Sequence, residues 1–481
     1  MAYKPILMRN VGVANSTSLD TYKAAGGYNA VNKAFAMKPD ELVEFVKSAN
    51  LRGRGGAGFP AGVKWSFLPP KRETTYLCVN ADESEPPTFC NRVLMENDPH
   101  MLLEGILIAG YATRTTTAYI YMRGEFTELF HIVQKALDEA YAAGLFGKNI
   151  LGSGYDLECY VHRGAGAYVC GEETGLIESL EGKRGWPRIK PPFPAIEGAF
   201  HKPTVVNNVE TLACLPHILE RGVEWWNGLG TKNSKGTKLY CISGPVKTPG
   251  CYEAPLGLST RELIYSDDFG GGMRDGIKVK ACSPGGLSMG FLRGDLFPKA
   301  TDGEVDPTRD CDELDCLLDF DDVRRYGMLG LGTAAAVVIG EDTDMRDVLL
   351  NVCRFYAMES CGQCTQCREG TMWMYRIAER LHAGAGRSYD LDLIAEVTRN
   401  MGMMPGMSIC GLPDGAAFPI RHLVEKFRPE FERHIAEQSP DAAKTWIKKT
   451  NPAAYELPIL EGRATTYKAG TMLLPEHLRN D

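Results

Sequence analysis

The chain has 481 residues, of which 44% are hydrophobic and 24% charged, and its formal net charge at pH 7 is −8. This length predicts about three domains, and the acidic balance argues against a dedicated nucleic-acid-binding protein. No apolar run reaches the roughly 18 residues of a membrane-spanning helix, because Glu104 interrupts the best candidate. The N-terminus shows no apolar signal-peptide region.

The first 236 residues predict an arm over 1–38 followed by an α/β domain over 39–236. An amphipathic helix is expected at 39–50, with Pro39 and Asp40 as start signals. After it, three expected strands alternate with three expected helices: 75–80, 100–112, 118–124, 126–144, 156–163 and 170–182. Such alternation predicts a parallel sheet with ligand-binding loops at its strand ends.

The remainder predicts a small α+β domain, a helical domain and a tail. Residues 237–340 hold short β-rich segments and one helix-like stretch. Residues 341–437 hold long amphipathic segments and predict a helical bundle. Residues 438–481 lose this periodicity, so we expect a tail running over a surface.

Three cysteines spaced three residues apart, Cys361, Cys364 and Cys367, mark a metal or cluster site. Structural zinc favours two CxxC pairs, whereas CxxCxxC with one distant cysteine is an arrangement used for [4Fe–4S] clusters. Three unrelated thiols are the third interpretation. Cys353 lies in an apolar helix pattern and Cys410 in a glycine-flanked loop. We therefore predict an iron–sulfur site with Cys410 as fourth ligand.

A glycine loop precedes the first expected strand. Gly53, Gly55 and Gly58 satisfy G-x-G-x-x-G, but the motif follows a helix-like segment and precedes one that is not expected to be helical. It therefore fails the context of a dinucleotide-binding fingerprint. Its backbone N–H groups can still line an anion or a flat ring, and a simple tight turn is the alternative.

Further polar groups end the expected strands: Lys64 and Trp65, the stretch 80–83, the loop 164–175 and the stretch 205–211. Together they predict a cradle for a phosphorylated cofactor. The cradle is rich in acids, which would repel a phosphate, so we expect them to bind hydroxyls, ring nitrogens or a ribose. As alternatives, they complement a helix N-terminus or form a solvated turn.

Five stretches resemble the family of NADH-binding flavoprotein subunits of respiratory complex I: GRGGAGFPAGVKW, VNADESEP, GAGAYVCGEETGLIESLEGKRGWPRIKPPFPA, VVNNVET and ESCGQCTQCREG. They occur in order between about residues 35 and 435. Diaphorase subunits of soluble NAD-reducing hydrogenases and formate dehydrogenases share this core. The resemblance implies a Rossmann-like α/β FMN domain, a small β-grasp-like α+β domain and a C-terminal four-helix [4Fe–4S] domain.

The resemblance also implies site residues. Those expected to hold FMN are Gly53, Gly55, Gly56, Gly58, Lys64, Asn80, Asp82, Glu83, Asn207, Asn208 and Thr211. Those expected near NAD(H) are Gly171 and Glu172 at the nicotinamide, Phe59 and Phe67 at the adenine, and Glu85 and Lys183 at polar contacts, with Glu172 and Glu85 taken as catalytic. The expected cluster ligands are Cys361, Cys364, Cys367 and Cys410.

The implied chemistry joins these parts. NADH gives up a hydride, two electrons at once, and an iron–sulfur cluster accepts one, so a flavin must lie between them. The expected function is the NADH dehydrogenase module of complex I, delivering electrons toward quinone. The alternatives are a diaphorase subunit and an assembly paralogue with an impaired nucleotide site.

The expected partners are a thioredoxin-like [2Fe–2S] subunit and a large multi-cluster subunit, bound through the arms 1–38 and 438–481. The expected location is cytoplasmic, in a peripheral arm at the inner face of the cell membrane. One stretch departs from the family pattern: PPTFCNR places Pro87, Cys90 and Asn91 where Gly, Lys and Asp usually stand. This leaves the pocket beside Glu85 as the least secure part of the expected site.

Overall fold

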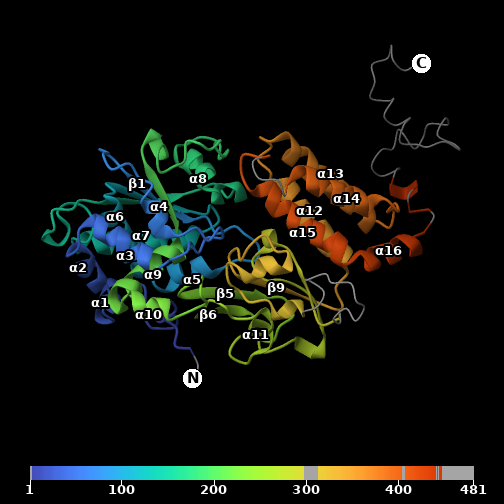
Figure 1. Cartoon of the computed structure of the whole chain (residues 1–481), viewed down its shortest axis with the longest axis horizontal. Helices are drawn as coiled ribbons and strands as arrows, with labels where there is room; N and C mark the ends of the chain where they lie inside the picture. The colour runs from blue at the N-terminus through green and yellow to red at the C-terminus, as the bar shows by residue number, and fades with distance from the viewer. Residues whose placement is uncertain (1–2, 297–311, 403–406, 440, 443, 447–481) are drawn as a thin grey trace, which may run out of the picture.

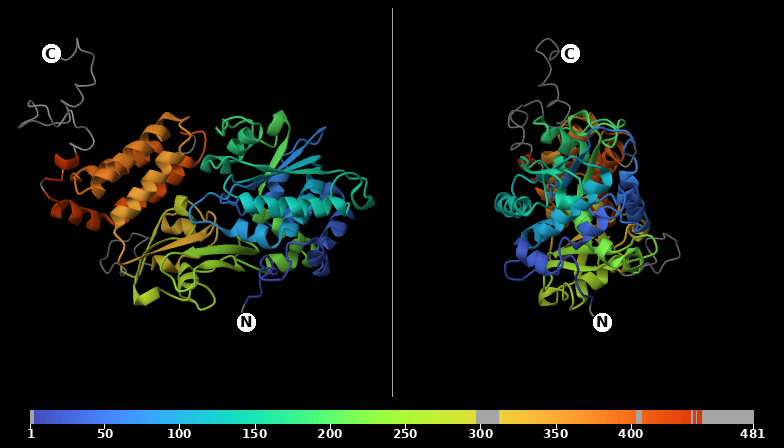
Figure 2. Two further views of the ribbon diagram at one scale, coloured as in Figure 1. Left: turned by 180° about the vertical axis from the view of Figure 1, so that it is seen from behind. Right: turned by 90° about the vertical axis from the view of Figure 1, so that its left-hand side faces the viewer.

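The computed structural model describes residues 3–296, 312–402, 407–439, 441–442 and 444–446. They form three units, an α/β unit and a helical unit side by side and a smaller mixed unit that contacts both (Figure 1). Seen from behind, the helical unit and the N-terminal helices stand at opposite ends of the molecule (Figure 2). The predicted tail 438–481 lies almost wholly outside the described residues. In the part that is described, no helix has the length and apolarity needed to cross a bilayer.

The first unit is built on a parallel sheet, as predicted. Its strands are β1 (Tyr76–Ala81), β2 (Thr117–Met122), β3 (Glu158–Arg163) and β4 (Thr204–Asn208), in the order β3-β2-β1-β4. Since β4 lies on the other side of β1 from β2, the strand order reverses between β1 and β4. In open parallel sheets, ligands bind at this reversal, beyond the carboxyl ends of the strands.

Helices cover this sheet on both faces. Leu77 and Val79 of β1 pack into one core with the helices listed here: α5 (Cys90–Asn97), α6 (Pro99–Thr113), α7 (Thr127–Ala142) and α9 (Val209–Arg221). Cys78, on the opposite face of β1, packs in a second core with α8 (Glu173–Leu180) and with the helical unit. α6 is buried on nearly every side, which explains its continuous apolar sequence.

The segment expected to be an N-terminal arm packs into the first unit. It forms α1 (Leu19–Ala24) and α2 (Asn29–Phe35), followed by α3 (Pro39–Ser48). Tyr22 is fully buried, and its hydroxyl donates a hydrogen bond to Glu104 Oε2 over 2.5 Å. Helices of six and seven residues are too short to show a helical period in sequence.

The second unit carries a five-stranded mixed sheet in the order β6-β5-β9-β7-β8. The strands are β5 (Thr237–Ser243), β6 (Gly250–Pro255), β7 (Val279–Ser283), β8 (Leu292–Arg293) and β9 (Ala335–Gly340). The helix α11 (Thr260–Tyr265) packs on it, and α10 (Val223–Asn227) connects it to the first unit. β6 lies at one edge of this sheet.

The helical unit consists of α12 (Met345–Glu359), α13 (Thr365–His382), α14 (Asp390–Met401), α15 (Leu412–Lys426) and α16 (Arg428–Glu437). Each helix buries one apolar face in a shared core. The cysteine motif precedes and enters α13, and Cys410 precedes α15. Two helix N-termini thus meet at the cysteines.

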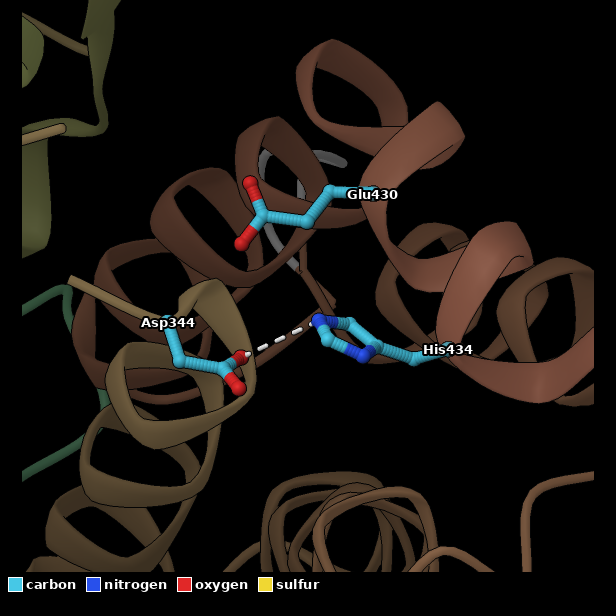
Figure 3. A group of neighbouring side chains, drawn as sticks. All are labelled: Asp344, Glu430 and His434. Carbon is cyan, nitrogen blue, oxygen red and sulfur yellow. Dashed lines mark ion pairs between the residues drawn. The ribbon is translucent and has the colours of Figure 1, made fainter. Parts of the chain in front are cut away.

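Asp344, Glu430 and His434 fasten α16 to the start of α12 (Figure 3). Asp344 caps α12 and pairs with Arg346 over 2.7 Å, and His434 Nε2 lies 3.6 Å from its Oδ1. Glu430 pairs with Lys280 over 3.3 Å. Asp, Glu and His are all residue types that can bind a metal ion. Here, however, Arg346 and Lys280 already neutralise the two carboxylates. We therefore assign the group a structural role.

Replacing Asp344 with alanine is expected to destabilise the helical unit by about 1 kcal/mol, because the cap and the Arg346 pair are lost. Burial acts to raise the pKa of Asp344, but the interaction with Arg346 outweighs it and lowers this pKa to about 2. A lowered pKa stabilises the fold above the unfolded value of about 3.9, so the difference between wild type and D344A should shrink as pH falls from 4 to 2. Urea unfolding followed by circular dichroism measures this difference in the free energy of unfolding. Asp347→Ala, at a more exposed aspartate, is the control and should have a smaller effect.

Candidate cofactor and cluster site

Two joined cavities open at the reversal of strand order. The outer cavity, of about 470 Å³, is lined by the first unit alone. The inner cavity, of about 490 Å³, lies between all three units. They share lining residues: Gly55, Gly56, Ala57, Asn80, Gly171, Glu172 and Asn208. The two cavities therefore form one continuous site.

The glycine loop forms the common wall. Gly56 has φ +129°, and a Cβ on it would meet no protein atom within 4 Å. A Cβ on Gly58, at φ +66°, would lie 2.4 Å from the ring of Phe320. Position 58 thus needs glycine for packing, whereas position 56 presents bare backbone to the cavity. Such backbone can approach a ligand closely.

The expectation that no helix follows the glycine loop was wrong. The five-residue helix α4 (Ala61–Trp65) begins directly after Pro60, and one turn is too short to give a periodic signal. The loop follows α3 and not a strand, so the arrangement still differs from a dinucleotide fingerprint. Through α4, Lys64 reaches the outer cavity.

Two lysines and two glutamates face one another at the start of α8. Lys64 lies 3.3 Å from Glu173, and Lys190 lies 2.8 Å from Glu172 and 3.4 Å from Glu173. Burial raises the pKa of Glu173, but both lysines outweigh it and hold that pKa below its usual value. Glu172 caps α8 by accepting hydrogen bonds from the N–H groups of its first turn.

Lys183, expected near the nucleotide, lies outside both cavities and pairs with Glu181 over 2.7 Å. Lys190 lines the outer cavity instead. Sequence reasoning missed Lys190, although it stands in the quoted stretch IKPPFPA. A lysine in a proline-rich loop carries no periodic signal, so only the chain path shows where its side chain goes.

The expected amide and hydroxyl residues gather at the strand ends. Asn80 donates to the carbonyl of Gly171 over 2.8 Å, which links β1 to the loop before α8. Asn207 Oδ1 accepts from Trp65 Nε1 over 2.9 Å. Two more of these residues make hydrogen bonds within the fold. Asn208 caps α9, and the Thr211 hydroxyl accepts a hydrogen bond from the N–H of Arg54. Each of these polar groups is fixed before any ligand arrives.

Asp82 lines the inner cavity and has one buried carboxylate oxygen without a hydrogen-bond partner. Its Oδ1 is buried without a hydrogen-bond partner, while Oδ2 accepts from Ser84 over 3.0 Å. Burial raises the pKa of Asp82 to about 7. Buried polar atoms are almost always hydrogen-bonded, so this atom fits a ligand with N–H or O–H groups, such as a flavin ring or a ribityl chain.

Glu85 and Glu83 differ in role. Glu85 lines the inner cavity and accepts hydrogen bonds from Tyr168 Oη over 2.5 Å and from Ser288 N over 2.7 Å, and burial raises its pKa. Glu83 instead accepts from Asn91 N over 2.6 Å and from Arg92 over 3.1 Å. It therefore anchors the start of α5.

The departing stretch PPTFCNR keeps this anchor. Cys90 and Asn91 begin α5, and the bond from Asn91 to Glu83 uses the backbone N–H, which any residue except proline supplies. Thr88 N donates to the carbonyl of Glu85 over 2.7 Å. Asn91, like Asp82, lines the inner cavity and has a buried Oδ1 without a hydrogen-bond partner.

Phe59 and Phe67 stand at the rim of the outer cavity. Their rings are 6.0 Å apart, and the residues are 45% and 53% exposed. Exposed large aromatic rings beside a cavity are suited to stacking on a flat ligand ring. The geometry agrees with the expected adenine contact.

The four cysteines expected as ligands lie on two facing loops. The N–H of Ile409, beside Cys410, points to Cys364 Sγ over 3.5 Å, and Cys367 and Cys410 both interact electrostatically with Cys361. Burial raises the pKa of Cys367 to about 11, so a bound metal must displace protons. The positive ends of α13 and α15 favour an anionic cluster here. The set fits a cluster held by three thiolates of one loop and one of another.

Cys410 also lines the inner cavity, together with Gly411 and Leu412. Cys353 is fully buried in the core of the helical unit. One of the expected ligands thus forms part of the wall that encloses the neighbouring cavity. Whatever binds in that cavity lies next to the cysteine site.

Comparisons with known proteins agree with this geometry. Residues 46–217 match the family model of the Nuo51 FMN-binding domain, and residues 347–434 match the NADH-ubiquinone oxidoreductase-F iron-sulfur binding region. The chain is 47% identical over 438 residues to the second F subunit of the NADH-quinone oxidoreductase of Rhizobium meliloti, covering 91% of this chain and 99% of that protein.

Two further relatives extend the comparison. The mitochondrial NADH dehydrogenase [ubiquinone] flavoprotein 1 of Dictyostelium discoideum is 47% identical over 402 residues, covering 83% of this chain and 79% of that protein. The structure is also similar to a chain of an NAD+-reducing [NiFe]-hydrogenase in the H2-reduced state, with a TM-score of 0.74 and 33% identity. That match covers 90% of this chain and 70% of the other.

Proposed function

The chain belongs to the family of F subunits of NADH-quinone oxidoreductase, and on this premise we propose how its residues serve that activity. It is an FMN- and [4Fe–4S]-binding flavoprotein subunit that oxidises NADH. The observation that carries the proposal is that Cys410 lines the cavity that also meets the glycine loop. A flavin in this cavity and a cluster at the cysteines would lie on the two sides of Cys410.

The chemistry that bound FMN would supply is to accept a hydride and to pass on single electrons. The backbone of the glycine loop and Lys64 would hold its phosphate, which N–H groups and a lysine suit. Asn80 and the unpartnered Asp82 Oδ1 would bind ring or ribityl hydrogens. Glu83 contributes indirectly, by anchoring the start of α5.

The residues around the outer cavity would orient NADH. Phe59 and Phe67 would stack on the adenine, and Lys190, which lines the outer cavity where Lys183 does not, would face the phosphates. Glu172 and Glu85 stand where the nicotinamide would meet the flavin. Hydride transfer needs no general acid, so these side chains act by position and charge.

We extend the proposal to assembly. The second unit is assigned as β-grasp-like and α12–α15 as the four-helix cluster domain. The partners would be a thioredoxin-like [2Fe–2S] subunit and a large multi-cluster subunit, with the assembly peripheral to the inner face of the cell membrane. A diaphorase role in a soluble hydrogenase is the alternative, and the higher identity to the complex I relatives favours the first assignment.

Anaerobic purification tests the central claim. Protein isolated without air is expected to contain one flavin and about four irons per chain, and its visible absorption should bleach when NADH is added. Protein that folds and holds iron without flavin would contradict the assignment. Co-purifying subunits would separate the complex I role from the hydrogenase role.

Glu85→Gln is expected to lower the KM for NADH about fivefold and leave flavin content unchanged, because removing one negative charge from the cavity wall relieves about 1 kcal/mol of repulsion with a nucleotide that is itself negatively charged. Burial raises the pKa of Glu85. As the solution is acidified, this side chain therefore becomes protonated, and neutral, at a higher pH than an exposed glutamate does. The wild-type KM should therefore approach that of E85Q as pH falls. Asp82 in the same cavity titrates in both proteins, so the ratio of the two KM values isolates the effect of Glu85.

Tyr168→Phe is the matched control, since it removes the hydrogen bond to Glu85 without changing charge. Steady-state NADH oxidation across the pH range supplies the comparison. Equal KM changes in both variants would assign Glu85 a hydrogen-bonding role, and an unchanged KM in E85Q would refute any role at the nucleotide.

A further inference from the structure

Three thiols lie side by side where the first and second units meet, and of these only Cys90 also lines the inner cavity. Cys241 belongs to β5, Cys251 to β6, and Cys90 begins α5. Cys241 and Cys251 are direct partners in the antiparallel register of the two strands. The Cys241 thiol interacts with the thiols of both Cys90 and Cys251.

The register of β5 and β6 brings the pair near the separation that a disulfide requires. Directly opposite residues in an antiparallel pair have Cβ atoms about 4.5–5.5 Å apart, and a disulfide requires about 3.5–4.5 Å. A shift of about 1 Å closes this difference. Because β6 is an edge strand, it can move without disturbing a further neighbour in the sheet.

Access differs among the three thiols. Cys90 and Cys241 are 2% and 0% exposed, whereas Cys251 is only partly buried. Burial raises the pKa of Cys241. At Cys251 a hydrogen bond from Cys241 favours the thiolate, although burial and nearby charge still leave its pKa raised. A small oxidant therefore meets Cys251 first.

We propose that Cys241 and Cys251 are an oxidation site, at which a hydroperoxide converts the two thiols into a cross-strand disulfide. Cys251 sulfur attacks one oxygen of hydrogen peroxide, the O–O bond breaks, and a sulfenic acid and one water form. Cys241 sulfur then attacks that sulfenic sulfur, the S–S bond forms, and a second water leaves. The two thiols lose two electrons and two protons, and the peroxide is reduced to two waters.

The disulfide would reach the cofactor cavity through one segment. Cys241 Sγ accepts a hydrogen bond from Phe89 N over 3.4 Å. Phe89 stands between Thr88 and Cys90, which both line the inner cavity. Drawing Cys241 toward Cys251 weakens this contact, so we expect a severalfold change in the KM for NADH. This kinetic consequence rests on the proposed function, whereas the disulfide does not.

Disulfide mapping tests the site on the full-length protein. After treatment with hydrogen peroxide and blocking of free thiols with N-ethylmaleimide, digestion and mass spectrometry are expected to show a Cys241–Cys251 linked peptide that dithiothreitol removes. Cys251→Ser should abolish it, and Cys282→Ser, a buried thiol on β7 of the same sheet, should not.

Two results would overturn the proposal. One is the absence of the linked peptide in wild-type protein under conditions that oxidise its other thiols, which needs no variant to fold. The other is a Cys90–Cys241 link that forms instead. A linked peptide with unchanged NADH kinetics would retain the oxidation site and remove its effect on the cavity.

Discussion

Replacing Cys410 with serine is expected to abolish the [4Fe–4S] cluster, whereas replacing Cys353 with serine leaves it in place. Cys410 faces the loop of the other three cysteines, and a serine hydroxyl is a much harder ligand than a thiolate. Cys353 is fully buried in the apolar core of the helical unit, within helix α12. The iron and sulfide content per folded chain should therefore fall sharply in C410S alone.

C353S is expected to be less stable than the wild type, because a buried hydroxyl in that core lowers the free energy of unfolding by about 1–3 kcal/mol. Its yield is expected to fall while each folded molecule retains a full cluster. Flavin content should persist in C410S, since the glycine loop and Lys64 are untouched. Full iron in C410S, or its loss only in C353S, would move the fourth ligand to Cys353.

Signals that repeat along the chain were predictable from sequence. Alternating apolar patterns predicted β1 to β3 and their helices, and the spacing of the cysteines predicted the cluster site. The comparisons confirm the iron–sulfur region that the cysteine spacing predicted and the FMN-binding region that the family resemblance implied. Both signals are local, because periodicity and spacing are properties of short windows.

Features without a local period were not predictable. α4 has one turn, and α1 and α2 have two or fewer, so no window shows their helical faces. Lys190 and Lys183 look alike in sequence, and only the path of the chain decides which one meets the cavity. The contact between Cys241 and Cys251 depends on strand register, which sequence alone leaves open.

Gly56→Ala is expected to weaken FMN binding about 30- to 150-fold, corresponding to about 2–3 kcal/mol. Alanine at φ +129° is strained, and its methyl group points into the cavity, where it meets no protein atom within 4 Å. The space that it fills is the space that the ligand needs. Flavin released from the purified protein by acid, measured by its fluorescence, gives the occupancy.

Gly144→Ala is the control that distinguishes backbone strain from steric exclusion of the flavin. Gly144 also has a positive φ, +69°, and a Cβ there also meets nothing within 4 Å, but it is exposed at the end of α7 and lines neither cavity. This variant is expected to lose about 1 kcal/mol of stability and to keep its flavin. Equal flavin loss in both variants would mean that strain alone expels the cofactor, and full flavin in G56A would place the FMN away from the glycine loop.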